Sequence, residues 1–168
     1  MFFSCQTESN ERQNFSNQPQ EPLASSTHVE WLYTKNGRAS FVLKSPMIDR
    51  YGGGEPYLEF PQGLEINSFE ITGQKDASLS ADYAIQNLST SIIEARGMVV
   101  LENAEGEKLE TEYLIWDEKE EQIHTKEFVK ITKSNQVIMG EGFISDIYFS
   151  KYSLKKSRGA IEVGLTKP

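Results

Sequence analysis

The chain has 168 residues, 38% of them hydrophobic, and its 25 acidic and 17 basic side chains give a formal net charge of −8. This charge argues against binding of nucleic acid and against docking on anionic lipid through a basic patch, because both require a positive surface. The length predicts a single domain, and no apolar run approaches the roughly 20 residues of a membrane-spanning helix.

The first five residues resemble the end of a bacterial lipoprotein signal. Two aromatic residues and a serine precede Cys5, which is the only cysteine of the chain. In such signals the cysteine after the cleavage point is lipidated, so we expect residues 1–5 to be a signal remnant with Cys5 as a lipid anchor. The alternative is a free cysteine at a frayed end. A lone cysteine cannot form an intrachain disulfide, so the redox compartment stays open.

Residues 6–28 have the composition of a disordered tether. The segment is rich in Gln, Asn, Ser and Glu, it contains two prolines, and Phe15 and Leu23 are its only bulky apolar residues. Such a segment cannot bury enough apolar surface to order itself. As a flexible chain it would span on the order of 25 Å, which is enough to lift a domain off a membrane. A disordered end without a role is the alternative.

Residues 29–168 are expected to form one all-β domain. Strand-like runs at 30–34 and 39–43 flank Asn36-Gly37, a strong hairpin signal because both residues tolerate positive φ. The glycines at 52–54 are interpreted as a turn, since a phosphate loop would need a lysine and a following helix. Alternating segments follow at 57–60, 64–66 and 69–71, and no segment has convincing helical periodicity.

From residue 81 to residue 163 one unit of about 30 residues is written three times. The copies open at Ala81-Asp82-Tyr83, Thr111-Glu112-Tyr113 and Ser145-Asp146-Ile147, and they close at 97–101, 127–131 and 159–163. The third copy does not keep the spacing of about 30 residues that relates the first two. A period of this length with β-type alternation is typical of coils of sheet stacked on one another.

Alternation within the repeats predicts which side chains face inward. Val129 and Ile131 flank Lys130, so Lys130 should point outward and its two neighbours inward. The pattern changes phase after Glu112, which predicts a bulge or a corner there. The inward stripe is compatible with a closed core and with an apolar groove that is open to a lipid.

No group of residues has the spacing of a catalytic or metal site. His28 and His124 each stand alone, and the sequence has no Gly-x-Ser-x-Gly elbow. The acidic residues at 117–121 could be compared with the paired carboxylates of glycosidases, but acids in a turn are typical of a solvated loop. We therefore expect no enzyme activity, no metal and no other cofactor.

Several motifs then carry a family resemblance. They are Phe60-Pro61-Gln62-Gly63-Leu64-Glu65-Ile66, Ser78-Leu79-Ser80-Ala81-Asp82-Tyr83-Ala84, Leu109-Glu110-Thr111-Glu112-Tyr113-Leu114-Ile115-Trp116-Asp117 and Ile123-His124-Thr125-Lys126. The most specific is Gly140-Glu141-Gly142-Phe143-Ile144-Ser145-Asp146 with Phe149-Ser150-Lys151-Tyr152. In order and spacing these motifs, spread over roughly 32–163, resemble the LptC family of periplasmic lipopolysaccharide-export proteins in its Bacteroidetes-type form.

The resemblance implies a fold, a function and partners. The fold would be a single open β-jelly-roll of stacked antiparallel strands, shaped like a folded taco, that shields acyl chains. The function would be to bind lipopolysaccharide and transfer it across the periplasm, from the permeases of an inner-membrane ABC transporter to a periplasmic bridge protein of similar fold. Better-known members carry a membrane-spanning helix, and here a lipidated Cys5 would anchor the protein to the inner membrane on its periplasmic side.

The resemblance and the alternation together give the expected site residues. The lipid-binding interior would comprise Ala81, Ala84, Ile93, Val99, Leu101, Leu109, Thr111, Leu114, Trp116, Ile123, Val129, Ile131, Phe143, Tyr148, Ile161 and Val163. The edge for strand addition by the bridge protein would comprise Gly159, Ala160, Ile161, Glu162 and Val163. The opposite end, at 31–43, would face the transporter.

Two other function classes stay open. One is a structural or adhesive β-solenoid with a closed core, and the other is a small β-helical enzyme that acts on envelope polysaccharide. A lipid that co-purifies with the protein would exclude the first. Hydrolase activity that a single carboxylate substitution abolishes would establish the second.

Overall fold

A computed structural model of the chain describes residues 21–35, 37–70 and 72–162, and all regular structure in these residues is β-strand. The eleven strands belong to one antiparallel sheet, so the prediction of an all-β fold is confirmed. The strands are β1 (Ala24–Lys35), β2 (Arg38–Tyr51), β3 (Tyr57–Phe60), β4 (Leu64–Phe69), β5 (Lys75–Ala81), β6 (Tyr83–Asn87), β7 (Ile92–Asn103), β8 (Lys108–Asp117), β9 (Gln122–Thr132), β10 (Gln136–Asp146) and β11 (Tyr152–Glu162).

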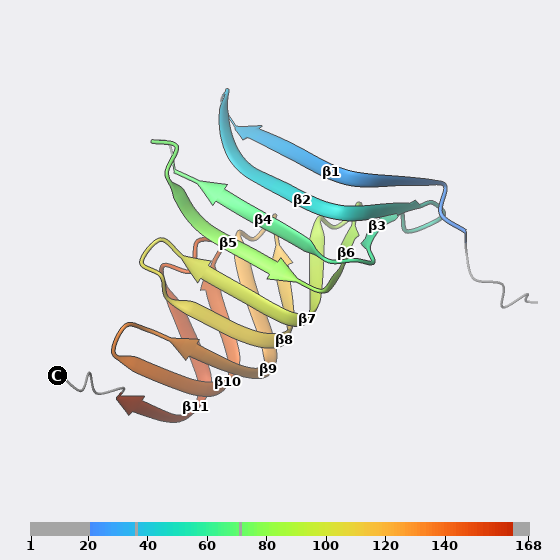
Figure 1. The fold of residues 1–168 in the computed structure, drawn as a ribbon. Helices are drawn as coiled ribbons and strands as arrows, with labels where there is room; N and C mark the ends of the chain where they lie inside the picture. The colour runs from blue at the N-terminus through green and yellow to red at the C-terminus, as the bar shows by residue number, and fades with distance from the viewer. Residues whose placement is uncertain (1–20, 36, 71, 163–168) are drawn as a thin grey trace, which may run out of the picture.

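The strands form a stack with β1 at one end and β11 at the other (Figure 1). From β7 to β11 every strand pairs with its sequence neighbour, and β7 also pairs with both β5 and β6. The predicted hairpin at Asn36-Gly37 is confirmed, because β1 and β2 pair up to Lys35 and Arg38.

The sheet is folded lengthwise into two arms. The first half of β7 (Ile92–Arg96) pairs with β6, and its second half (Val99–Asn103) pairs with β5, so one strand serves both arms. We call the half that contains β4 and β5 the first arm and the half that contains β3 and β6 the second arm. The strand register shifts at the fold line in β7, β8 and β10, which confirms the corner predicted after Glu112. We call this line the spine.

The spine explains the repeat. Asp82, Glu112 and Gly142 stand at corresponding spine positions, so the period of about 30 residues is confirmed and each unit is one strand up and one strand down. The predicted alignment of the third unit is wrong, because it matched Asp146 with Glu112, whereas the structural equivalent of Glu112 is Gly142. Gly142 has no side chain that could be matched with Glu112. Glycine is favoured at this position because the backbone φ is 68° and an added Cβ would crowd the side chain of Lys155.

The core lies between the two arms. Val129 and Ile131 are fully buried, whereas Lys130 points outward and pairs with Glu110 at 2.7 Å, as the alternation predicted. Further ion pairs cross the outer surface of the first arm, and their solvent-exposed side chains contribute little to stability. The stabilising contribution therefore comes from the apolar interior.

The domain begins earlier than the sequence indicated. β1 starts at Ala24, inside the segment 6–28 that was expected to be a tether, and Ala24–Thr27 pair with Met47–Arg50. These side chains are exposed, so backbone hydrogen bonds order the segment where the composition gave no signal. The remainder of the tether and Cys5 lie outside the described residues. Within the described ranges there is no helix that is long and apolar enough to cross a membrane.

Candidate functional site

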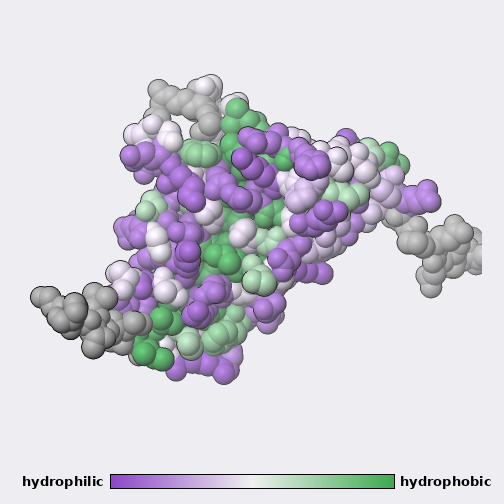
Figure 2. All heavy atoms as spheres, viewed as in Figure 1, coloured by the Kyte–Doolittle hydropathy of each residue, from purple (hydrophilic) through white to green (hydrophobic). Residues whose placement is uncertain are grey.

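The free ends of the two arms, opposite the spine, enclose a cavity of about 340 Å³. We call it the mouth cavity. It is lined by Tyr33, Thr34, Ser40, Phe41, Ile66, Ser68, Ala77, Ser78, Leu79, Leu101, Trp116, Glu118, Glu121, Ile123, Ile147 and Tyr148. Figure 2 shows a stripe of apolar side chains running down the molecule between two hydrophilic flanks. The volume lies within the range of small-molecule sites.

Three aromatic rings bridge the arms at this cavity. Tyr33 of β1 stacks on Phe41 of β2 with 4.3 Å between ring centroids, and Phe41 meets Trp116 of β8 edge to face at 5.8 Å. Such rings supply a large apolar contact surface with little conformational freedom to lose. The apolar wall of the mouth cavity is therefore largely formed before any ligand arrives.

A second cavity of about 490 Å³ lies at the β1 end of the stack. We call it the end cavity. Its lining includes Trp31, Ile48, Leu58, Gln86 and Leu88, and Tyr33 lines both cavities. Tyr33 is therefore a wall residue that the two cavities share.

Toward the β11 end the mouth is closed by Phe149, which is fully buried. Its ring lies 5.6 Å from that of Phe143 and 5.3 Å from that of Tyr152, and Lys133 lies over Tyr152. The side chain of Asn103 donates a hydrogen bond to the carbonyl oxygen of Phe149 across the gap between the arms. The interior at this end is a packed core.

The rim of the mouth cavity is acidic. Burial raises the pKa of Glu118, and the Asp117 carboxylate raises it further. Burial also raises the pKa of Tyr148, with added contributions from Asp76 and Glu121. Glu118 and Glu121 are the charged side chains among the described lining residues, so the rim favours neutral or cationic groups over phosphate. No group of three or more His, Cys, Asp or Glu in the described chain could hold a metal ion.

Two polar atoms near the cavities are buried without a hydrogen-bond partner among the described residues. They are the indole nitrogen Nε1 of Trp116 and the side-chain oxygen Oε1 of Gln86. The other amide atom of Gln86, Nε2, donates to Oε1 of Glu118 at 3.4 Å. Buried polar groups in folded proteins are nearly always paired, so these two atoms set the site apart from an ordinary core.

Most of the predicted interior residues are buried, but they form two groups. Leu101, Trp116 and Ile123 line the mouth cavity. The others lie in the packed interior away from it: Ala81, Ala84, Ile93, Val99, Leu109, Thr111, Leu114, Val129, Ile131 and Phe143. The sequence left a closed core and an open groove as alternatives, and the structure contains a closed core with a cavity at its open side. Contact of any of these residues with a lipid stays a prediction.

Two predicted interior residues are exposed. Tyr148 is 40% exposed on the rim of the mouth cavity, because the turn that Asp146 caps directs Phe149 inward instead. Ile161 is 61% exposed. It pairs with Val137, which pairs with Thr132, and this row faces away from Ile131 on the outer surface. The misplaced third repeat caused this error, and Val163 lies outside the described residues.

Sequence reasoning missed the wall that the first arm contributes. Phe41, Ile66 and Leu79 lie on alternating segments before the repeats, so their pattern could have placed them inside. Phe149 lies in a loop, and its inward direction depends on a backbone φ of 55°. Because Phe149 is not in a strand, strand alternation does not predict the direction of its side chain.

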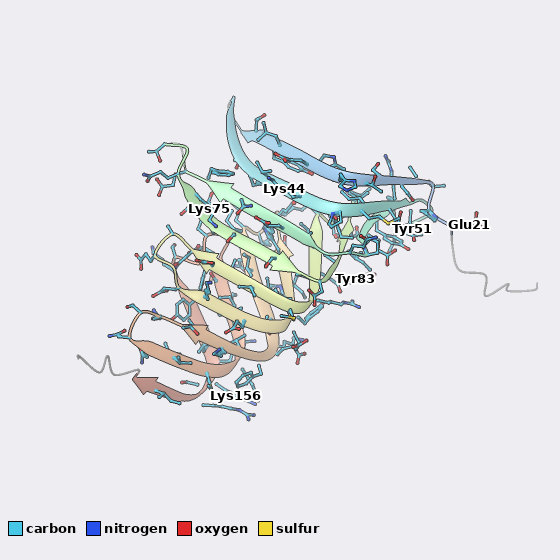
Figure 3. The ribbon with its side chains drawn as sticks, viewed as in Figure 1. Glu21, Lys44, Tyr51, Lys75, Tyr83 and Lys156 are labelled. Carbon is cyan, nitrogen blue, oxygen red and sulfur yellow. The ribbon has the colours of Figure 1, made fainter. Side chains whose placement is uncertain are left out.

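The predicted partner-binding edge lies on the last described strand. β11 pairs with β10 and has no described strand on its other side. Gly159, Ala160, Ile161 and Glu162 belong to β11, and Val163 lies outside the described residues. The strand is longer than expected and also carries Lys156 and Arg158, which are exposed beside Glu141. Figure 3 shows Lys156 at the β11 end of the stack and Lys44 near the opposite end.

Comparison with protein families gives a match that covers the whole described domain. A family model described as lipopolysaccharide-assembly, LptC-related, matches residues 1–162, which includes all eleven strands. Comparison with individual curated proteins gives no match.

Proposed function

Since the chain belongs to the LptC-related family of lipopolysaccharide-assembly proteins, we propose that its mouth cavity receives acyl chains of lipopolysaccharide during export. The family is a component of lipopolysaccharide export and not a family of enzymes. The observation that carries the proposal is the cavity between the open ends of the arms, with the aromatic bridge of Tyr33, Phe41 and Trp116 in its wall.

The physical basis is the transfer of hydrocarbon out of water. Each methylene group that leaves water contributes about 0.8 kcal/mol, so an apolar wall can hold an acyl chain without many directed contacts. Glu118 and Glu121 on the rim oppose the entry of a phosphorylated headgroup. The acyl chains would thus lie between the arms while the headgroup stays outside.

The position of the cavities suggests a direction of movement. The end cavity is lined in part by β1, and β1 pairs only with β2 among the described strands. A chain delivered by the permeases of an inner-membrane transporter would enter at this end. The opposite edge, β11, would pair with a periplasmic bridge protein of similar fold by strand addition. Lipidation of Cys5 would hold the protein at the inner membrane on its periplasmic side.

Photo-crosslinking at two phenylalanines tests lipid binding. Phe41 lines the mouth cavity, whereas Phe128 is 46% exposed on β9 and does not line it. A photo-reactive phenylalanine analogue at position 41 should capture lipopolysaccharide in cells, and the same analogue at position 128 should not. Equal capture at the two positions, or capture at 128 alone, would contradict the proposal.

A further inference from the structure

We propose that Trp116 and Gln86 select acyl chains that carry hydroxyl or amide groups over unsubstituted hydrocarbon chains. The inference rests on the proposed function, and it adds a chemical class of ligand to it. It starts from the two unpaired polar atoms at the cavities.

The first atom is the indole Nε1 of Trp116. The side chain is only 6% exposed and lines the mouth cavity, and its N–H has no acceptor among the described residues. A buried donor without a partner is unfavourable because it has lost its hydrogen bond to water. A ligand oxygen that reaches this N–H restores the lost bond.

The second atom is Oε1 of Gln86, whose side chain is 7% exposed and lines the end cavity. Its orientation is set by Glu118. An ionised carboxylate only accepts hydrogen bonds, so the amide nitrogen of Gln86 must face it, and the bond is 3.4 Å long. The amide oxygen is left as an acceptor without a donor among the described residues.

The two atoms belong to one row on the inner face of the second arm. Gln86 of β6 pairs with Ile93 of β7, and Ile93 pairs with Trp116 of β8. Neighbouring strands are about 4.8 Å apart, so the backbones of β6 and β8 are separated by roughly 10 Å. Gln86 lines the end cavity and Trp116 lines the mouth cavity, and the buried side chain of Ile93 lies between them in the row.

The chemistry of the ligand follows from this arrangement. An unsubstituted chain offers neither of the two buried atoms a hydrogen-bond partner. A hydroxyl group can accept from Trp116 or donate to Gln86, and an amide can do both through different atoms. A site with buried hydrogen-bonding groups rejects the analogue that lacks the matching polar group, so discrimination arises mainly from weaker binding of the plain chain.

The test compares two saturated fatty acids of equal length, one plain and one with a hydroxyl group near the carboxyl end. Binding to the full chain is measured by titration calorimetry, and the indole N–H of Trp116 is followed by NMR, with its signal assigned from Trp116→Phe. The wild type should bind the hydroxylated chain about three- to tenfold more tightly, which corresponds to one hydrogen bond. The indole signal should shift downfield with the hydroxylated chain only.

Three variants separate hydrogen bonding from packing. Trp116→Phe and Gln86→Met keep apolar bulk and should reduce the preference to less than twofold. Tyr113 lies on β8 like Trp116, but its hydroxyl donates a hydrogen bond to Glu94 of β7 on the outer face of the sheet. Tyr113→Phe removes this hydroxyl and should keep the full preference. Equal binding of the two fatty acids by the wild type, or a preference retained in both Trp116→Phe and Gln86→Met, would overturn this inference while leaving lipid binding intact. Binding of neither fatty acid would overturn the proposed function, and this inference with it.

Discussion

The side-chain nitrogen Nδ2 of Asn103 donates a hydrogen bond of 3.2 Å to the carbonyl oxygen of Phe149, and this bond joins the free ends of the two arms. The oxygen of the same amide accepts from the backbone N–H groups of Glu105 and Glu107, so the side chain is held from both sides. Asn103 ends β7 in the first arm, and Phe149 lies in the loop between β10 and β11 of the second arm. The open side of the fold is closed at this point, and the mouth cavity is confined to the rest of it.

Substitution of Asn103 should show how much this bond stabilises the protein. Asn103→Asp keeps an acceptor for the turn but cannot donate to Phe149, so we expect a loss of about 1–3 kcal/mol in the free energy of unfolding. Asn103→Ala should lose more, because the turn at Glu105 and Glu107 also loses its acceptor. Urea titration measures both. An Asn103→Asp variant as stable as the wild type would show that the arms are joined by packing alone.

Truncation of Phe149 should be among the most destabilising changes in any loop of the protein. Phe149→Ala removes a fully buried ring from contact with Phe143 and Tyr152, and we expect a cost of about 3–5 kcal/mol. The neighbouring Tyr148→Ala serves as the control and should cost less than about 1 kcal/mol, because that side chain is 40% exposed and lies on the rim of the cavity instead of in the core. Similar urea midpoints for the two variants would contradict the placement of Phe149 in the core.

The pH dependence of stability should change in Glu118→Gln. Burial, and then the Asp117 carboxylate, raise the pKa of Glu118 above its ordinary value, so the folded protein binds this proton more readily than the unfolded chain does. Stability therefore falls as the pH rises from the ordinary pKa of a glutamate side chain to the raised pKa of Glu118, and the ionised group destabilises the fold at neutral pH. We expect Glu118→Gln to raise the thermal midpoint at pH 7. This advantage should disappear when the pH falls below the ordinary pKa of a glutamate side chain.

A control for net charge accompanies this measurement. Glu120→Gln removes an exposed carboxylate from the same turn and should leave the thermal midpoint nearly unchanged at both pH values. If Glu120→Gln and Glu118→Gln behave alike, relief of the overall negative charge explains the effect and burial of Glu118 does not.

Two glycines with similar backbone angles distinguish crowding from backbone strain. Gly63 and Gly106 have φ of 85° and 77°, but a Cβ on Gly63 would lie 2.5 Å from the carbonyl oxygen of Ala81, whereas a Cβ on Gly106 meets nothing within 4 Å. Gly106→Ala should cost about 1 kcal/mol from the left-handed backbone alone. Gly63→Ala should cost clearly more, because the spine must shift. Equal costs in urea titration would mean that the spine is not tightly packed at Gly63.

The β11 edge can be tested by deletion. Removal of residues from Gly159 onward takes away the second part of β11 but leaves Tyr152 and Leu154, which pack on the core. We expect a folded domain by circular dichroism that no longer binds the bridge protein. Removal of residues 163–168 leaves all of β11 and should preserve binding. Unchanged affinity in the longer deletion would place the contact elsewhere.

Sequence reasoning succeeded where side chains alternate and failed where the chain turns. Val99, Val129 and Ile131 were predicted inside because β-branched residues flank outward residues, and all three are fully buried. Ile161 was predicted wrongly because the spine position of the third unit is a glycine, which offers no side chain to match. Alternation gives the direction of a residue only when the register is known.

The mouth cavity could not be predicted from the alternation of side chains along the sequence. Its walls combine Phe41 and Leu79 of the first arm with Trp116 of the second, and these residues meet only because the sheet folds at the spine. The inward turn of Phe149, which limits the cavity, depends on one loop residue with positive φ. The start of β1 at Ala24 depends on pairing with β2, a non-local interaction that composition does not report.

The spine positions at 82, 112 and 142 also define how such a domain can change in length. Each unit between two of them adds one hairpin, and two more strands extend the stack by roughly 10 Å without altering its cross-section. Insertion or loss of a whole unit preserves the register of every remaining strand, whereas insertion of a single residue within a strand reverses its faces. The architecture therefore tolerates growth in fixed steps, and the reach of the domain is set by the number of units.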